Sequence, residues 1–189
     1  MITVYQTRKE MFGDLLPKQA VGAELGVQFG INAKDLIRIT NPTKLYLCDA
    51  WEVQDGSYEA AQKIVVKYGP NIEMIKAWDQ DWIPTLEDRS LDWVYVDTLH
   101  NYPHTKLELS LLKGKVKVDG IIAGHDFICF ANHMCPHANS WEGGVMLAVL
   151  ETVSEGWLEI VALTRGAGNS DAPAQYPSWA CRVKSVTVP

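Results

Sequence analysis

The sequence of 189 residues has no long hydrophobic run, few cysteines and no excess of positive charge. Its longest apolar stretches, such as residues 145–150, fall far short of the roughly 18 residues that a transmembrane helix needs. The N-terminal segment lacks the charged-then-apolar pattern of a secretion signal. The four cysteines are too sparse and too irregularly spaced for a secreted disulfide framework. We therefore expect a cytoplasmic protein whose thiols are reduced.

Negative charge exceeds positive charge, since 23 Asp and Glu residues stand against 17 Lys and Arg residues and give a formal net charge of −6. No Lys/Arg cluster offsets this balance, which disfavours nucleic acid and anionic membranes as partners. Small neutral or cationic ligands remain compatible with it. A chain of this length folds as a single domain that buries about 70% of its unfolded surface, so it needs no disulfide or metal to fold.

Short apolar runs alternate with longer segments of helical periodicity, which is typical of an α/β fold. The runs that predict strands are residues 20–25, 44–48, 71–76, 91–96 and 120–123. The segments that predict helices are residues 31–39, 57–68, 83–87, 103–113 and 141–155. Because these strands are apolar on both faces, we expect a parallel sheet that is covered by helices on both sides.

The C-terminal part of the chain predicts two more strands, residues 157–163 and 179–186. No helix fits in the small-residue loop between them, so we expect an antiparallel hairpin at the edge of a seven-stranded sheet. Residues 1–19 are expected to form an N-terminal extension. Residues 125–141 have no clear regular pattern and predict a loop near the active site.

The first motif follows the first predicted strand and reads Glu-Leu-Gly-Val-Gln-Phe-Gly from residue 24 to residue 30. In an open parallel sheet, ligands bind beyond the carboxyl ends of the strands, where glycines let a ligand approach the backbone. The spacing differs from the Gly-x-Gly-x-x-Gly of a dinucleotide site, which disfavours a nicotinamide dehydrogenase. The carboxylate of Glu24 would repel a phosphate and attract an ammonium group. The alternative is that Gly26 and Gly30 serve only the strand-to-helix turn.

Acidic and aromatic side chains follow the next two predicted strands. Asp49 ends the second strand, where it could accept hydrogen bonds from both hydroxyls of a ribose, and Trp51 could flank an adenine ring. After the third strand, Trp78 could stack on adenine and Asp79 could accept a hydrogen bond from its amine. The alternatives are that Trp51 is a core aromatic and that Asp79 is a surface residue after a packed Trp78.

The fourth and fifth predicted strands end in a group of acids and histidines. Asp97 ends the fourth strand, His100 follows in the turn, and the fifth strand leads into His125 and Asp126. Adjacent strand ends bring Asp97, His125 and Asp126 together. Two carboxylates and an imidazole suit a divalent cation, and carboxylate oxygen favours Mg²⁺ or Mn²⁺. Hydrogen bonds that secure the loops are the alternative, although two unneutralised carboxylates would repel each other.

In this order, the motifs resemble those of class I S-adenosylmethionine-dependent methyltransferases. Within that class they are similar to methyltransferase domain family 24, which includes macrolide-sugar and cephalosporin O-methyltransferases. The matching segments are residues 24–26, 49–51, 96–102, 119–127 and 144–149. The resemblance implies a Rossmann-like fold, with the backbone near Gly26 holding the methionine part of the cofactor. It also implies that Glu24 lies near the cofactor ammonium and that Asp49 holds the ribose.

The resemblance further implies a Mg²⁺ site at Asp97, His125 and Asp126. Catechol-type relatives have Asp at the position of His125, so His125 either binds the metal or orients the substrate while the two carboxylates bind it. His100 has the spacing from Asp97 at which those relatives carry a lysine base. Leu99 departs from the family, which commonly has Asp there, and it removes a carboxylate that would raise the pKa of His100.

We therefore expect a methyltransferase that O-methylates a small-molecule hydroxyl with the assistance of Mg²⁺ and with Asp97 and His100 as catalytic residues. Because the N-terminal extension is short, we expect an acceptor pocket that is either open or completed by a partner subunit in a homodimer. A second interpretation is a catalytically inactive S-adenosylmethionine-binding domain that acts as a sensor or partner subunit.

Zinc binding is a separate hypothesis for the loop after the fifth strand. Its candidate ligands are His125, Cys129, His133, Cys135 and His137. Their spacing does not match a paired ligand-knuckle pattern. A loop that borders the acceptor pocket, or a polar surface loop, is the simpler interpretation.

Overall fold

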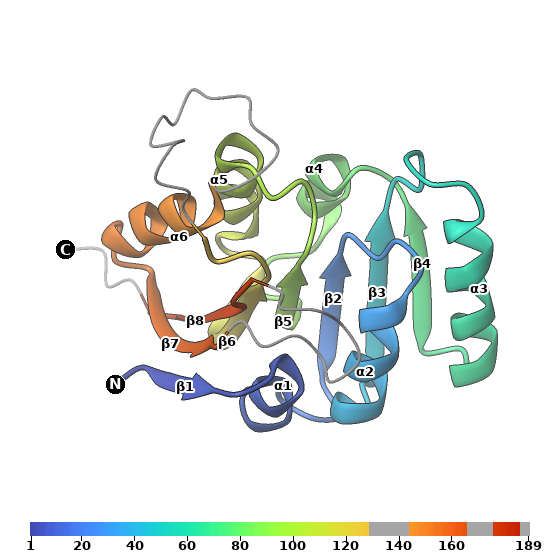
Figure 1. Cartoon of the computed structure of the whole chain (residues 1–189), viewed down its shortest axis with the longest axis horizontal. Helices are drawn as coiled ribbons and strands as arrows, with labels where there is room; N and C mark the ends of the chain where they lie inside the picture. The colour runs from blue at the N-terminus through green and yellow to red at the C-terminus, as the bar shows by residue number, and fades with distance from the viewer. Residues whose placement is uncertain (129–143, 166–175, 186–189) are drawn as a thin grey trace.

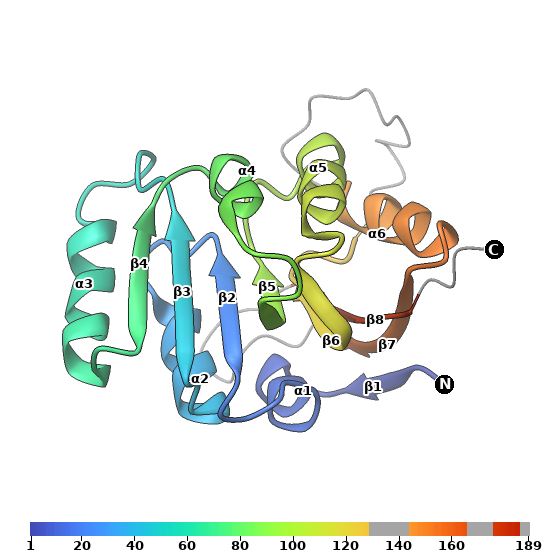
Figure 2. The ribbon, with the colours of Figure 1, turned by 180° about the vertical axis from the view of Figure 1, so that it is seen from behind.

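The computed structural model describes residues 1–128, 144–165 and 176–185, which form one mixed sheet between two layers of helices (Figures 1 and 2). The strands are β1 (Thr3–Tyr5), β2 (Val21–Leu25), β3 (Lys44–Asp49), β4 (Ile72–Lys76), β5 (Leu91–Val96), β6 (Val116–Gly124), β7 (Leu158–Thr164) and β8 (Trp179–Val183). The helices are α1 (Arg8–Leu15), α2 (Ile31–Thr40), α3 (Ser57–Tyr68), α4 (Asp79–Trp82), the 3-10 helix η1 (Ile83–Thr85), α5 (Tyr102–Leu112) and α6 (Val145–Ser154). The strand order is β1-β7-β8-β6-β5-β2-β3-β4.

The centre of the sheet is formed by β5, β2 and β3, which pair in parallel. On β5, Trp93 and Tyr95 face one side, whereas Val94 and Val96 face the other. Because helices cover both sides, the strand is apolar along nearly its whole length. The register aligns Leu25 of β2 with Val96 of β5, so the residues that follow these strands meet at one edge of the sheet.

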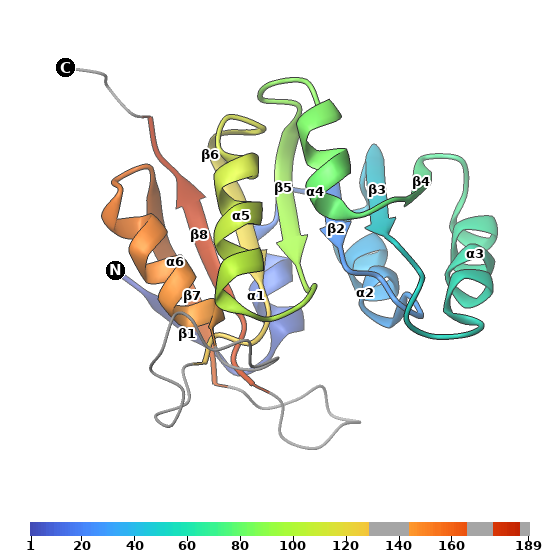
Figure 3. The same ribbon diagram turned by 90° about the horizontal axis from the view of Figure 1, so that it is seen from above.

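Two layers of helices bury the two faces of the sheet, as the view from above shows (Figure 3). Helices α1, α2 and α3 cover the side of Tyr95 with buried residues such as Phe12 and Leu36. Helices α4, α5 and α6 cover the opposite side with buried residues such as Leu109 and Val149. Among the described residues, none of the helices combines the length and the hydropathy that crossing a membrane requires.

The structure confirms the α/β class, the mostly parallel sheet, the helices on both faces and the antiparallel pairing of β7 with β8. The sheet has eight strands where the sequence predicted seven. The additional strand, β1, pairs in parallel with β7 and forms the edge that we expected the hairpin to occupy. With three largely exposed residues, β1 is too short for a recognisable period-2 pattern. The predicted extension 1–19 therefore contains β1 and α1.

Several predicted boundaries shift in the structure. The short helix that we expected at residues 83–87 begins earlier as α4 and continues as η1. Two acidic residues in the first turn of α4 favour that start, because they complement the helix dipole. Strand β6 begins four residues before the predicted start and passes through Asp119, which has a left-handed φ of 65°. Residues 141–143 of the predicted helix 141–155, and residue 186 of the last predicted strand, lie outside the described residues.

Candidate functional site

The turn after β2 is shaped by two glycines. Gly26 has a φ of +79°, and a Cβ atom there would lie 2.0 Å from the carbonyl oxygen of Asp97. Gly30 has a φ of +72°, and a Cβ there would lie 2.5 Å from Cδ1 of Ile64. Larger residues would be strained in this backbone conformation. Gly26 therefore lets the turn after β2 lie against the end of β5, whereas Gly30 lets it lie against α3 and leaves the N-terminus of α2 without a side-chain cap.

Asp49 holds the same turn from the end of β3. Its Oδ2 accepts hydrogen bonds from the backbone N–H groups of Val27 and Gln28, both at 2.8 Å, and its Oδ1 accepts one from Trp51 at 2.6 Å. Trp51 is buried, donates its indole N–H to the carbonyl of Gln28 at 2.9 Å and packs edge-on against Tyr58. Trp51 thus occupies a core position, and Asp49 keeps one lone pair on Oδ1 that these bonds do not use.

Glu24 is a fully buried acid at the end of β2. Its Oε1 accepts a hydrogen bond of 2.7 Å from the side-chain amide of Asn32 on α2. Within the described residues, Oε2 of Glu24 has no hydrogen-bond partner. Burial raises the pKa of Glu24 to about 8, although the bond from Asn32 opposes this shift. A buried acceptor without a donor is costly, so this position favours a ligand that brings a donor or a positive charge.

Trp78 and Asp79 lie at the start of α4 and differ in exposure. The Trp78 side chain is partly exposed, whereas Asp79 is buried against α5. The Asp79 carboxylate lies 3.0 to 3.2 Å from Nε2 of His104. His104 in turn lies 3.6 Å from Oε1 of Glu108, which accepts a 2.7 Å hydrogen bond from the Thr98 hydroxyl. These contacts connect Asp79, which we predicted to lie near adenine, with Thr98 in the loop after β5.

Burial and the contacts with His104 shift the pKa values of the two acids in this cluster. Burial raises the pKa of Glu108 well above its ordinary value. Burial also acts to raise the pKa of Asp79, but the contacts with His104 outweigh it and hold that pKa below its ordinary value. Sequence reasoning missed His104 and Glu108. Their spacing of four residues places them on one face of α5, and this spacing is the signal that could have found them.

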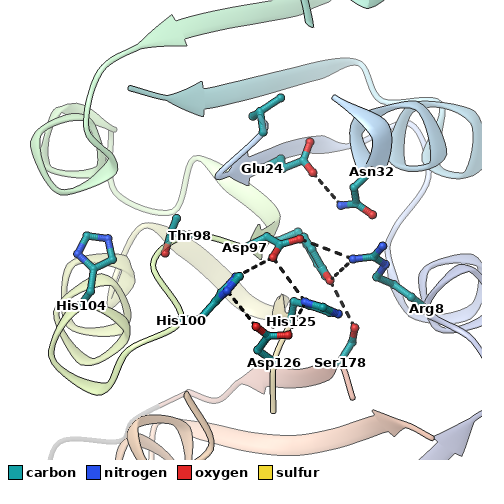
Figure 4. Close-up of polar contacts among 12 residues, drawn as sticks. Arg8, Glu24, Asn32, Asp97, Thr98, His100, His104, His125, Asp126 and Ser178 are labelled. Carbon is teal, nitrogen blue, oxygen red and sulfur yellow. Dashed lines mark hydrogen bonds and ion pairs between the residues drawn. The ribbon is translucent and has the colours of Figure 1, made fainter. Parts of the chain in front are cut away.

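The predicted metal residues converge at the ends of β5 and β6 (Figure 4). His100 bridges two acids: its Nε2 lies 2.9 Å from Oδ1 of Asp97, and its Nδ1 lies 2.9 Å from Oδ2 of Asp126. Nδ1 of His125 lies 2.7 Å from Oδ1 of Asp126 and 3.7 Å from Oδ1 of Asp97. The structure therefore brings together Asp97, His100, His125 and Asp126. The other candidate zinc ligands, at positions 129, 133, 135 and 137, lie outside the described residues.

The electrostatics of this group centre on His100. Burial alone would lower the pKa of His100, but its contacts with Asp126 and Asp97 outweigh burial and raise the pKa to about 10. Burial acts to raise the pKa of Asp126, but its contacts with His100 and His125 outweigh burial and hold that pKa below its ordinary value. A protonated His100 thus pairs with both carboxylates and offsets one of their two negative charges. It does so with a left-handed φ of 53°, a strained conformation for histidine that is often found at functional sites.

Arg8 reaches the site from α1, on the side of Asp97 away from His100 (Figure 4). Its Nη1 donates a 3.1 Å hydrogen bond to the hydroxyl of Tyr95 and lies 3.6 Å from Oδ2 of Asp97. Sequence reasoning missed Arg8, which lies in the segment treated as an extension. A single arginine in a weakly amphipathic helix carries no signal of its own at the sequence level.

The sheet order and the acidic edge beyond β2, β3 and β5 define a class I methyltransferase fold. The sequence model of methyltransferase domain family 24 matches residues 21–127, which is more than half of the chain. The chain belongs to this family of S-adenosylmethionine-dependent methyltransferases. No curated protein sequence matches it significantly.

Solved structures share the fold at low sequence identity. An rRNA methylase from Streptococcus thermophilus is 14% identical with a TM-score of 0.63, over 94% of each chain. A Streptococcus mutans protein in complex with S-adenosylhomocysteine is 12% identical with a TM-score of 0.64, over 93% of this chain and 94% of that chain. Aeropyrum pernix fibrillarin, which holds natively bound S-adenosylmethionine, is 13% identical with a TM-score of 0.61, over 88% and 68%. At these identities the similarity shows the fold alone.

Proposed function

We propose that the protein transfers a methyl group from S-adenosylmethionine to a hydroxyl oxygen of a small molecule. The observation that carries this proposal is the buried Oε2 of Glu24, which has no partner among the described residues and lies beside the Gly26 turn. An ammonium group there would donate the hydrogen bond that Oε2 lacks, and its positive charge would stabilise the buried carboxylate. The methionine part of S-adenosylmethionine carries such a group, and its sulfonium supplies the electrophilic methyl.

The same edge offers residues for the rest of the cofactor. Gly26 and Gly30 would let the cofactor approach the backbone, and the free lone pair of Asp49 would accept a ribose hydroxyl. The partly exposed Trp78 is our candidate for stacking on adenine. Asp79, the acid that we predicted for the adenine amine, is buried and already contacts His104, so an adenine amine would have to compete with that contact. The buried Trp51 would support this site indirectly, through its contacts with Asp49 and Gln28.

Asp97 and Asp126 are our candidates for holding Mg²⁺, with His125 as a third ligand or as a residue that orients the substrate. Their carboxylate oxygens suit a hard cation, and Mg²⁺ would supply the positive charge that they otherwise take from protonated His100. His100 can accept the proton of the acceptor hydroxyl only when its imidazole is neutral. Base catalysis by His100 therefore requires that its contacts with the two carboxylates weaken.

Calorimetry tests the cofactor and the metal separately. We expect S-adenosylhomocysteine to bind, and we expect Mn²⁺ to bind with one equivalent per chain. A His125→Asn variant separates the two roles of His125, because a metal ligand lowers Mn²⁺ affinity when removed and a substrate-orienting residue leaves it unchanged. Failure of the wild-type protein to bind S-adenosylhomocysteine would refute the proposed function. Binding of the cofactor with turnover that survives chelation would refute the metal-assisted version alone.

A nucleic-acid acceptor is a second candidate, contrary to our expectation from the net charge. Four cations line a groove of about 520 Å³ between α2 and α3. They are Lys34, Arg38, Lys63 and Lys67, and in the described part of the chain none of them has an ion-pair partner. One structural neighbour is an rRNA methylase. Labelled methyl transfer to total RNA, compared with transfer to a panel of phenols and sugars, distinguishes the two acceptors.

A catalytically inactive cofactor-binding domain is favoured by one observation, the two ion pairs that keep His100 protonated. An Asp97→Asn variant and a His100→Ala variant separate this interpretation from the enzyme. Loss of biological function in both variants supports catalysis, and full function in both supports a sensor or partner subunit.

A further inference from the structure

We propose that Arg8 binds the carboxylate of the cofactor's methionine part. This inference rests on the proposed function and deepens it, because it assigns a cofactor contact to the N-terminal helix, outside the segment that the family model matches. The methionine part is a zwitterion, so a complete site needs a cation for its carboxylate as well as an acid for its ammonium. Arg8 is the candidate for that cation.

Helix α1 is fixed in a position that directs Arg8 toward the site. Thr7 caps the helix by accepting a 3.2 Å hydrogen bond from the backbone N–H of Glu10. Met11 and Phe12 are fully buried, and the ring of Phe12 meets the ring of Tyr95 edge-on at 5.0 Å. The first helical residue, Arg8, therefore projects over the carboxyl end of β5 from a helix that is packed into the core.

The guanidinium group of Arg8 has N–H donors available for a ligand. Both of its hydrogen-bond and ion-pair contacts within the described residues, with Tyr95 and Asp97, are made by Nη1, and its Cζ lies 5.7 Å from the centre of the Tyr95 ring. A guanidinium has five N–H donors, and two parallel donors match the two oxygens of a carboxylate. The side chain also keeps 14% of its surface exposed, so a ligand can reach it. The 3.6 Å separation from Asp97 is an ion pair that is too long for a hydrogen bond.

The negative charge of the acids around the proposed cofactor site favours a cation beside the ligand carboxylate. Four acids lie along the edge of the sheet where the cofactor would bind: Glu24, Asp49, Asp97 and Asp126. A ligand carboxylate that enters this edge alone would be repelled by them. The charge of Arg8 acts to lower the pKa of Glu24 against the effect of burial. The pKa of Arg8 is raised although burial opposes this, first by Tyr95 and then by the charges of Asp97 and Glu24. Arg8 thus offers a cation for the carboxylate of an amino acid, and Glu24 offers an acid for its ammonium group.

Two ligands that differ only in the carboxylate test the proposal by calorimetry. S-adenosylhomocysteine carries the ammonium and the carboxylate, whereas S-adenosyl-3-thiopropylamine carries the amine alone. We expect the wild-type protein to bind S-adenosylhomocysteine about 10- to 100-fold more tightly, the range typical of hydrogen bonds to charged groups. In Arg8→Met the preference should fall to near one, because only the ligand with the carboxylate loses a partner.

Two further variants keep the test decisive. Lys9→Met removes a cation from the next position of α1, where Lys9 forms a partly exposed ion pair with Asp35 at 3.1 Å, and it should leave both affinities unchanged. Arg8→Lys keeps the charge but loses the two parallel N–H donors of the guanidinium group, so it should give an intermediate preference. If Arg8→Met does not fold, this variant provides the test.

Three outcomes would overturn the proposal, and each is distinct. Equal weakening of both ligands in Arg8→Met would show a structural role that acts through Tyr95 and Asp97. A preference that survives in Arg8→Met and Arg8→Lys would place the carboxylate elsewhere. A wild-type protein that binds both ligands equally makes no carboxylate contact. Wild-type protein that binds neither ligand would instead refute the proposed function itself, and the assignment of Arg8 with it.

Discussion

Replacement of Glu24 by Gln should stabilise the free protein and weaken cofactor binding at the same time. Glutamine keeps the shape of the side chain and can still accept the hydrogen bond from Asn32, so the substitution removes mainly the charge. The folded-state pKa of Glu24 is raised from 4.5 to about 8. The folded protein therefore holds this proton more tightly than the unfolded chain does, and the wild type loses stability as the pH rises from about 4.5 through about 8.

The size of the effect follows from the pKa shift. Since each pKa unit corresponds to about 1.4 kcal/mol, the stability gained by Glu24→Gln should grow by up to about 4 kcal/mol between pH 5 and pH 9. Urea unfolding of both proteins at pH 5, 7 and 9 measures this difference. Calorimetry with S-adenosylhomocysteine at pH 7 should show an affinity at least tenfold lower in the variant, because the ammonium loses its charged partner.

The exposed Glu52 offers a matched control, since Glu52→Gln removes the same charge outside the core. It should change neither the pH dependence of unfolding nor the affinity by a comparable amount. A Glu24→Gln variant that is less stable than the wild type at pH 9 would show that the carboxylate is satisfied in the free protein. A variant with unchanged affinity would show that Glu24 does not contact the ammonium.

Gly26→Ala should lower the free energy of unfolding by at least about 2 kcal/mol in urea titrations, because its Cβ would lie 2.0 Å from the carbonyl of Asp97; a smaller loss would mean that the turn relaxes easily. Asp126→Asn should lower Mn²⁺ affinity at least about tenfold by calorimetry, and unchanged affinity would remove Asp126 from the metal site. Glu108→Gln should cost less than about 1 kcal/mol in thermal unfolding, because burial raises the pKa of this carboxyl and so favours its neutral form, and the amide oxygen can still accept from Thr98. Glu108→Leu should cost about 1 to 3 kcal/mol more, and equal costs would contradict the role of this bond.

The parts of the fold that the sequence predicts are those with a strong periodic signal. Strands β2, β3 and β5 are buried on both faces, and the helices between them have amphipathic patterns, so their type and order could be derived. Strand β1 could not, because it contributes only three residues and depends on pairing with β7, some 160 positions away in the chain. A short edge strand acquires its conformation from its neighbour and carries little of it in its own residues.

In the candidate site, too, some features could be predicted from the sequence and others could not. The meeting of Asp97, His125 and Asp126 could be predicted, because adjacent parallel strands end at a common edge. Their hydrogen bonds could not, and in particular not the two contacts that raise the pKa of His100. The approach of Arg8 to this edge depends on how α1 packs against Tyr95, 87 positions later. Packing between distant elements leaves no local pattern in the sequence.

The distribution of charge at the site connects the cofactor and metal proposals. The acidic edge contains two places where positive charge is required, one at Glu24 and one between Asp97 and Asp126. In the free protein, Glu24 has a raised pKa and binds a proton instead. Between Asp97 and Asp126, protonated His100 supplies the positive charge. An ammonium group and a divalent cation would take over these two roles, releasing the proton of Glu24 and freeing His100 to act as a base. Binding of each ligand should therefore release protons, which calorimetry in buffers of different ionisation enthalpy measures, and ligand binding without proton release at pH 7 would show that neither site uses this exchange.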